Sequence, residues 1–331
     1  MDKKRQEIMV LPGSQLEELC AQACKEVILV APFIKASVLE RLLSKIPPQI
    51  ALKCVTRWRP EEILAGVSDL EVWTLLEDCP NASLWLRADL HAKYYRADQK
   101  CLVGSANLTS TALGWIRQIN LELLVLLPAN NTQLLNFEKD LFAGSVQVDQ
   151  TIFAQTQLAV QLLGEQQPII ASRKELYQLE PEGESQEVIT TDAWLPTLRN
   201  PEDLYLAYSG RLEELTTASR EIALLDLAVF QIPPDLPKAA FQAYVGSLLL
   251  QKPIIHSVDL FLSKPQRFGA VTHLLSSLPC SQTPNFDADR AWQTLMRWLR
   301  YFLPNRYTLS VPNYSEVFGK TTNPISRAQG T

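Results

Sequence analysis

Short apolar runs alternate with helical patterns over the first half of this chain, and this alternation constrains its fold more than any other feature. Glu26–Phe33 is a compact apolar run that fits a buried strand. Ala36–Ile46 then carries apolar residues at helical spacing, and Ile50–Thr56 alternates with period two. A strand, a helix and a second strand in this order predict a mixed α/β sheet flanked by helices. Further predicted strands are Ser83–Arg87, His91–Arg96, Lys100–Val103 and Asn120–Leu127.

Helical spacing predominates in the rest of the chain. At 331 residues the chain is longer than a typical domain, which favours two domains. Residues 164–203 are polar and acidic with few apolar anchors, so a boundary or a large loop is expected there. We therefore predict an α/β domain over residues 1–150 and a mainly helical accessory region over residues 151–331, with a disordered tail after Lys320. The predicted helices are Leu134–Phe142, Phe153–Leu163, Tyr205–Phe230, Ala239–Leu250 and Asp287–Phe302.

The apolar runs and the cysteines exclude several classes of protein. The longest apolar runs are far too short to cross a bilayer, and no secretory signal follows Met1. The six cysteines form no Cys-x-x-Cys pair and no zinc-type spacing with histidine. We interpret them as reduced and mostly buried, so the sequence predicts a cytoplasmic protein without a metal site, a cofactor or a membrane span.

The stretch His91–Asn107 brings four kinds of polar side chain together within seventeen residues. His91 and Lys93 lie two positions apart and would project from the same face of a strand. The next strand would return in a hairpin and bring Ser105 and Asn107 back toward His91. An imidazole, an ammonium, a hydroxyl and an amide at one spot suit a tetrahedral phosphate. The cation and donors can hold the oxygens while the imidazole attacks phosphorus or protonates the leaving oxygen.

This pattern resembles the signature of the phospholipase D superfamily, H-x-K-x(4)-D followed by G-S-x-N. The resemblance covers roughly residues 20–145 and is weak outside the motif. It implies a phospholipase D-like catalytic domain in which His91 is the nucleophile and forms a phosphohistidine intermediate. Lys93 and Asn107 would bind the non-bridging oxygens, and Ser105 would assist. The residues that fill the signature are His91, Lys93, Asp98, Gly104, Ser105 and Asn107.

Three further residues have expected supporting roles. Asp98 is expected to hold the turn of the hairpin, and Gly104 to let the backbone turn close to a ligand. Glu122 lies in an apolar strand run, where a carboxylate needs a partner. The resemblance to the single-motif nucleases of this superfamily implies that Glu122 orients His91 and fixes its tautomer.

The motif occurs once, although the chemistry of this superfamily uses two histidines. His256 and His273 lack a lysine two residues on, and His273 lies in a predicted helix. The simplest arrangement is a homodimer in which His91 of each copy meets the other across a two-fold axis. Metal independence follows from the same resemblance, because histidine and lysine do the work that carboxylate-bound Mg²⁺ does elsewhere.

The charge of the second half is unevenly distributed. Residues 151–251 carry 14 acidic and 6 basic side chains, whereas residues 252–331 carry 9 basic and 4 acidic ones. Such asymmetry can mark a surface for a polyanion, or the two parts can neutralise each other within one fold. Four arginines beside aromatic residues are the candidates for nucleic-acid contact, although the aromatic residues also fit the core side of a helix. The arginines are Arg290, Arg297, Arg300 and Arg306, and the aromatic residues are Trp292, Trp298, Tyr301 and Tyr307.

Three functions stay open from the sequence. The first is a metal-independent DNA or RNA nuclease in restriction or host defence, for which the resemblance implies a helicase or another ATPase as partner. The second is a phospholipase D or phosphatidyltransferase. The third is a non-catalytic module that binds a phosphodiester. The single motif, the missing membrane span and the position of the motif domain ahead of a second domain favour the nuclease.

Overall fold

The computed structural model describes residues 11–166, 191–311 and 316–321. The chain divides into two compact units, residues 1–153 and residues 154–331, and each is described by itself. Most of the stretch in which a boundary is predicted (residues 167–190) and the tail predicted to be disordered (from residue 322) lie outside the described residues. None of the helices in the described ranges combines the length and the apolar character needed to span a bilayer.

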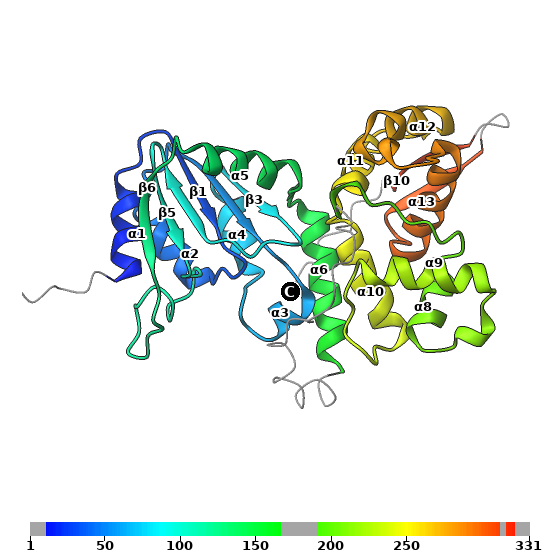
Figure 1. Cartoon of the computed structure of the whole chain (residues 1–331), viewed down its shortest axis with the longest axis horizontal. Helices are drawn as coiled ribbons and strands as arrows, with labels where there is room; N and C mark the ends of the chain where they lie inside the picture. Colours follow the sequence, from blue (N-terminus) through cyan, green and yellow to red (C-terminus); the bar gives the residue numbers. More distant parts are fainter. Residues whose placement is uncertain (1–10, 167–190, 312–315, 322–331) are drawn as a thin grey trace, which may run out of the picture. The chain divides into compact units, whose positions relative to one another are not determined.

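The first unit contains a seven-stranded mixed sheet in the order β6-β5-β4-β1-β2-β3-β7 (Figure 1). The strands β1, β2 and β3 are parallel, and the other four pair antiparallel with their neighbours. The predicted fold class, a mixed β-sheet flanked by helices and followed by a mainly helical region, is confirmed. The strands are β1 (Glu26–Val30), β2 (Ala51–Thr56), β3 (Ala82–Leu86), β4 (Tyr94–Ala97), β5 (Lys100–Gly104), β6 (Leu124–Pro128) and β7 (Val146–Gln147).

Different helices cover the two faces of this sheet. Val55 of β2 packs in one cluster with Leu141 of α5, which lies across the sheet in Figure 1. Its neighbour Cys54 points to the opposite face. Burial raises the pKa of the Cys54 thiol, and the nearby thiols of Cys20 in α1 and Cys79 after α4 raise it further. The helices of the first unit are α1 (Pro12–Ala21), α2 (Ala36–Leu43), α3 (Pro60–Leu64), α4 (Glu71–Glu77) and α5 (Thr132–Ala143). The next helix, α6 (Gln150–Gly164), begins in the first unit and lies mostly in the second.

One edge of the sheet collects the strand ends that carry the motif. The strands β1, β2, β3 and β5 end at this edge, whereas β4 and β6 begin there. The register shows this, because Val30 pairs with Tyr94 and Gly104 pairs with Leu124. We call this edge the motif edge. Strand direction therefore places the residues before β4, after β5 and before β6 close together.

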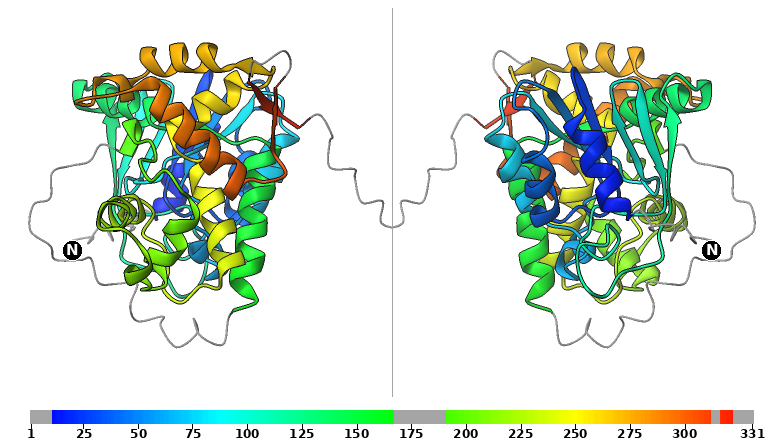
Figure 2. Two further views of the ribbon diagram at one scale, coloured as in Figure 1. Left: turned by 90° about the vertical axis from the view of Figure 1, so that its right-hand side faces the viewer. Right: turned by 90° about the vertical axis from the view of Figure 1, so that its left-hand side faces the viewer.

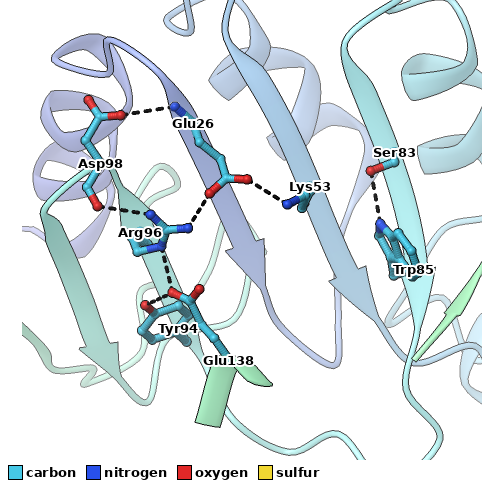
Figure 3. A network of polar contacts seen from close by, with 8 residues as sticks. All are labelled: Glu26, Lys53, Ser83, Trp85, Tyr94, Arg96, Asp98 and Glu138. Carbon is cyan, nitrogen blue, oxygen red and sulfur yellow. Dashed lines mark hydrogen bonds and ion pairs between the residues drawn. The ribbon is translucent and has the colours of Figure 1, made fainter. Parts of the chain in front are cut away.

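A charged network fixes β4 to its neighbours on the face covered by α5 (Figure 3). Arg96 of β4 forms ion pairs with Glu26 of β1 and, at 2.6 Å, with Glu138 of α5. Glu26 also binds Lys53 of β2 at 2.7 Å, and the Tyr94 hydroxyl donates a hydrogen bond to Glu138. Burial opposes the charge of Glu26, but Lys53 and Arg96 outweigh it and lower the pKa of this carboxyl. The network therefore locks the strand that directly follows the motif histidine and lysine.

The second unit is mainly helical and includes a three-stranded sheet, β8-β10-β9, that the sequence did not predict. The single helix predicted over Tyr205–Phe230 is wrong. It is divided at Gly210, whose φ of +78° ends the first part. In the left view of Figure 2, α10 (yellow) and α13 (orange) run beside each other. The elements are α8 (Glu202–Tyr208), α9 (Thr217–Ala228), α10 (Lys238–Leu249), α11 (Pro253–Phe261), β8 (Gln266–Arg267), α12 (Phe268–Ser277), α13 (Ala288–Phe302), β9 (Tyr307–Ser310) and β10 (Val317–Lys320), with short 3₁₀ turns at Thr191–Ala193, Leu212–Glu214 and Pro279–Gln282.

A buried carboxylate holds this small sheet to α11. Asp259 is 2% exposed and accepts hydrogen bonds from Arg306 at 2.6 and 2.8 Å and from the Tyr307 hydroxyl at 2.5 Å. Lys320 of β10 is a third partner at 2.8 Å. Burial opposes the charge of Asp259, but Arg306, Lys320 and Tyr307 outweigh it and lower the pKa of the carboxyl. Because the pKa is lowered, the carboxylate stabilises the fold above the ordinary aspartate pKa, and this contribution is lost as the pH falls through the folded pKa.

We expect Asp259→Asn to lower the free energy of unfolding by about 3 kcal/mol, because it leaves two partly buried cations without a countercharge. Urea denaturation at neutral pH measures this loss. Glu221→Gln is the control, since Glu221 is exposed on α9 and its change should stay below about 0.5 kcal/mol. Equal effects of the two substitutions would contradict the role assigned to Asp259.

Candidate active site

His91 and Lys93 lie at the motif edge, in an extended segment that leads into β4. The strand predicted from His91 begins at Tyr94 instead, because its partner β1 ends at Val30 and Pro32 has no N–H group with which to continue the pairing. The Lys93 ammonium donates a hydrogen bond of 2.7 Å to the His91 carbonyl oxygen. The His91 side chain is exposed, so a substrate can reach the imidazole.

The ammonium of Lys93 is less stable in this environment than in water. Partial burial lowers its pKa, and the positive charge of Arg57 lowers it further, while Glu122 acts in the opposite direction. The negative charge of Glu122 does not offset the combined effect of burial and Arg57 on this pKa. A dianionic or monoanionic phosphate at this edge would supply the missing negative charge.

The Gly-Ser-x-Asn turn after β5 is held from two sides. The buried Tyr95 hydroxyl donates a hydrogen bond of 2.5 Å to the Ala106 carbonyl oxygen. The Ser105 N–H donates at 3.0 Å to the carbonyl oxygen of Leu123. A Cβ atom on Gly104 would lie 1.8 Å from that Leu123 oxygen. Glycine is therefore required by the neighbouring backbone, which passes where a side chain would be.

Ser105 and Glu122 are joined directly. The Ser105 hydroxyl donates a hydrogen bond to one carboxylate oxygen of Glu122, and it accepts one from the Leu123 N–H at 3.1 Å. The Asn120 amide donates to the other carboxylate oxygen at 3.3 Å. In the described part of the chain no hydrogen bond joins Glu122 to the His91 ring. The structure thus places Glu122 beside Ser105, and its predicted action on the tautomer of His91 stays a prediction.

Asn107 is anchored by a contact with the segment that follows β1. Its neighbour Leu108 forms a bridge with Ile34, and the Leu108 N–H donates at 3.1 Å to the Phe33 carbonyl oxygen. The Oδ1 atom of Asn107 is buried and has no hydrogen-bond partner within the described ranges. A buried amide oxygen without a partner is rare, and only a hydrogen-bond donor could satisfy it, so a phosphate oxygen would have to be bound by the amide nitrogen of Asn107 instead.

Asp98 lies at the opposite edge of the sheet, in the turn between β4 and β5. Its φ is +50°, and its carboxylate accepts hydrogen bonds from the N–H groups of Cys24, Lys25 and Glu26 at 2.7, 2.9 and 3.0 Å. Desolvation opposes the charge, but these three donors outweigh it and lower the pKa of Asp98. Figure 3 shows the bond to Glu26. The residue therefore joins the hairpin turn to the start of β1, away from His91.

Two residues that support the site were not predicted. Tyr95 holds the Ala106 carbonyl oxygen, as described above, and Arg57 follows β2 at the motif edge. The Arg57 guanidinium donates at 3.1 Å to the carbonyl oxygen of Leu90, the residue before His91. Neither residue belongs to the recognised motif, and sequence spacing does not indicate that Arg57 lies beside Lys93.

The C-terminal arginines are only partly available for nucleic acid. Arg306 is bound to Asp259 and its side chain is 11% exposed, so a phosphate contact would have to displace a buried ion pair. The other three lie on the exposed side of α13. Trp292, Trp298 and Tyr307 are buried, so the stacking surface considered for them does not exist and they are core residues. The exposed arginines are Arg290, Arg297 and Arg300.

The described residues contain no group of three or more histidine, cysteine, aspartate or glutamate side chains that could hold a metal ion. The motif edge instead presents an imidazole, an ammonium and an arginine, together with a hydroxyl that is bound to a carboxylate. The imidazole and the ammonium can attack and bind a phosphate, but these groups are not the oxygen-rich ligand set that a divalent cation prefers.

Comparisons with known proteins give weak similarities. No family model matches the chain, and no curated protein matches it in sequence. Among solved structures, NucT from Helicobacter pylori is 14% identical with a TM-score of 0.32, over 40% of this chain and 89% of NucT. TrmBL2, an archaeal chromatin protein with a novel mode of DNA binding, is 12% identical with a TM-score of 0.30, over 42% of this chain and 53% of TrmBL2. Phosphatidylserine synthase from Haemophilus influenzae Rd KW20 is 14% identical with a TM-score of 0.34, over 48% of this chain and 42% of the synthase. At these TM-scores the similarities establish no family for this chain, and its function has to be argued from its own residues.

Proposed function

We propose that this protein is a phospholipase D-like phosphodiesterase that cleaves DNA or RNA without a metal ion. The observation that supports the proposal is that His91, Lys93 and the Ser105–Glu122 pair come from strand ends at the same edge of the sheet. Three different strand ends contribute these groups. His91 is exposed for attack, and Lys93 lacks a full countercharge, as a phosphate site requires.

The proposed reaction has two steps. The neutral imidazole of His91 attacks phosphorus, an N–P bond forms, and the P–O bond to the leaving group breaks. A second imidazole, initially protonated, gives its proton to the leaving oxygen. Water then attacks phosphorus, transfers a proton to the second imidazole, and breaks the N–P bond, which regenerates His91. Lys93 and Asn107 hold the non-bridging oxygens throughout.

The second imidazole is proposed to come from a second copy of the chain. His91 is the one histidine in residues 1–153 of the sequence, and it is exposed. A two-fold axis through the site would let each copy supply one imidazole to a shared centre. The site is then incomplete in a monomer, and the homodimer is the active species.

A specific observation keeps a lipid substrate as the second candidate. Leu121 and Leu123, on either side of Glu122, are 98% and 64% exposed. Apolar side chains at the rim of a phosphodiester site could contact acyl chains. Nucleic acid is preferred because the exposed arginines of α13 offer phosphate contacts, and the layout of a catalytic unit followed by an accessory unit fits a role in restriction or host defence. A helicase or ATPase partner remains part of that proposal.

We expect the purified protein to cleave plasmid DNA or single-stranded RNA in the presence of EDTA. The reason is that the proposed charges and proton donors all come from side chains. Gel assays on single- and double-stranded DNA and RNA measure this, beside an assay of head-group release from phospholipid vesicles. Head-group release without nucleic-acid cleavage would move the assignment to the lipid candidate. Binding of nucleic acid without cleavage of any substrate would contradict the enzyme.

A further inference from the structure

Arg57 connects three elements at the motif edge. It follows β2, and its Nε and Nη2 atoms donate to the two carboxylate oxygens of Glu62 in α3. Its remaining nitrogen, Nη1, donates at 3.1 Å to the carbonyl oxygen of Leu90. His91 is the next residue, so the guanidinium holds the backbone directly ahead of the nucleophile.

The geometry makes Arg57 a poor direct ligand for a phosphate. The side chains of Arg57 and Glu62 are each 17% exposed, and three of the five guanidinium N–H groups, one on each nitrogen, are already hydrogen-bonded within the protein. The Phe33 ring lies 5.6 Å from the Arg57 Cζ atom and limits its movement. Burial raises the pKa of Glu62 above its ordinary value, and the hydrogen bonds and charge of Arg57 only partly oppose this rise, so the carboxylate depends on this arginine. Arg57 and Glu62 therefore form a partly buried ion pair that holds the guanidinium in place.

The charge of Arg57 nevertheless reaches the site. The charged groups that act on Lys93 are Arg57 from the end of β2 and Glu122 from the segment before β6, with opposite signs. The ammonium itself is bound to the His91 carbonyl oxygen. Arg57 thus acts on His91 through the backbone at Leu90 and on Lys93 through the electrostatic field of its charge.

We propose that Arg57 is a positioning residue, which fixes the backbone that presents His91 and keeps the ammonium of Lys93 in need of an anionic ligand. The proposal rests on the proposed function of this site. It assigns two separable effects to Arg57. The planar guanidinium, with its several N–H donors, fixes the backbone, and the positive charge acts on Lys93. Lysine can replace the charge but not the planar guanidinium.

The test compares Arg57→Gln with Arg57→Lys in the full-length protein. We expect Arg57→Gln to lower kcat by about 30-fold with KM changed less than about threefold, because a misplaced nucleophile slows the chemical step. Arg57→Lys should show a similar loss of kcat.

The pH profile separates the two variants. Catalysis needs Lys93 protonated, so the rate falls as the pH rises through its pKa. This alkaline limb should move to higher pH in Arg57→Gln and stay in place in Arg57→Lys.

A second readout does not depend on activity. The pH dependence of acetylation of Lys93 by trace acetic anhydride, followed by mass spectrometry, measures the same titration in any folded variant. Its midpoint should rise in Arg57→Gln, fall in Glu122→Gln, and not rise in Glu62→Gln, which keeps the arginine. If Arg57→Gln does not fold, the double variant Arg57→Gln/Glu62→Gln removes the unpaired carboxylate and gives the same comparison.

The two proposals fail in different ways. Wild-type protein without cleavage of any phosphodiester would end the proposed function, while the acetylation profile would still report on Arg57. Unchanged kcat and an unchanged Lys93 midpoint in Arg57→Gln would overturn the inference even if the wild-type enzyme is active. If Arg57→Gln lowers kcat but Arg57→Lys keeps the wild-type kcat, only the positive charge of Arg57 matters. That result would contradict its positioning role.

Discussion

His91→Ala is expected to abolish phosphodiester cleavage, with a loss of at least about 1,000-fold in kcat. The substitution removes the nitrogen that forms the covalent bond to phosphorus, and no other histidine is present in residues 1–153. The side chain is exposed, so the fold should be unaffected and the melting temperature should stay close to the wild-type value. Cleavage assays and thermal denaturation on the same samples measure both quantities.

His273→Ala is the matched control, because His273 is an exposed histidine on α12 and lies outside the motif. It should retain full activity. Full activity in His91→Ala would contradict the assignment of the nucleophile.

The variant His91→Ala also tests the proposal that two copies of the chain share one site. After subunit exchange, an equal mixture of wild-type and His91→Ala chains should keep about a quarter of the wild-type activity, because only dimers with two imidazoles work. Half of the activity would mean that each copy works alone.

Lys93→Met is expected to lower kcat/KM by about 100- to 1,000-fold, since it removes the cation that holds the phosphate oxygens and keeps a side chain of similar length. Loss of a group that meets charge developing in the transition state should affect kcat more than KM. In the wild-type enzyme the pKa of Lys93 is lowered, so activity should decline on the alkaline side at a pH below the ordinary lysine value. Steady-state kinetics over a pH series measures both effects.

Lys100→Met is the control for this change. Lys100 begins β5 at the sheet edge opposite the site, is exposed, and donates a hydrogen bond of 3.0 Å to the side chain of Gln22. Its loss should change kcat/KM by less than about twofold. Comparable defects in the two lysine variants would indicate a general effect of charge on substrate binding and would contradict a specific role for Lys93.

Local patterns predicted the strands β1, β2, β3 and β5 of the first unit well, whereas β6 begins four residues later than predicted and β7 was not predicted. The apolar run at Glu26 and the alternation at Ile50 correspond to β1 and β2, because buried strands impose these patterns directly. The start of β4 was placed three residues early, since the end of the pairing depends on Pro32, which lies just after β1. In the second unit the three-stranded sheet was missed. Its strands are short, and β10 is joined to the rest of the unit by Lys320 and the buried Asp259, which no local pattern reveals.

The motif spacing predicts His91, Lys93, Ser105 and Asn107 as site residues. Strand direction places these four at the motif edge, because the hairpin that joins them is local in sequence. The hydrogen bond between Ser105 and Glu122 was not predicted, because it depends on the pairing of β5 with β6. Arg57 was missed for a related reason. It lies 36 positions before Lys93, and the parallel pairing of β1 and β2 is what carries it to this edge.

The need for glycine at position 104 gives a practical criterion for judging whether related chains are active. Even an alanine methyl group there would push β6 away from β5 and separate the serine hydroxyl from its acid, while the histidine and lysine stayed where they are. A homologue that retains both motif residues but has lost this glycine should therefore be inspected for lost turnover before it is counted as an enzyme. Gly104 takes no part in the proposed reaction, but its loss would disturb the arrangement of the residues that do.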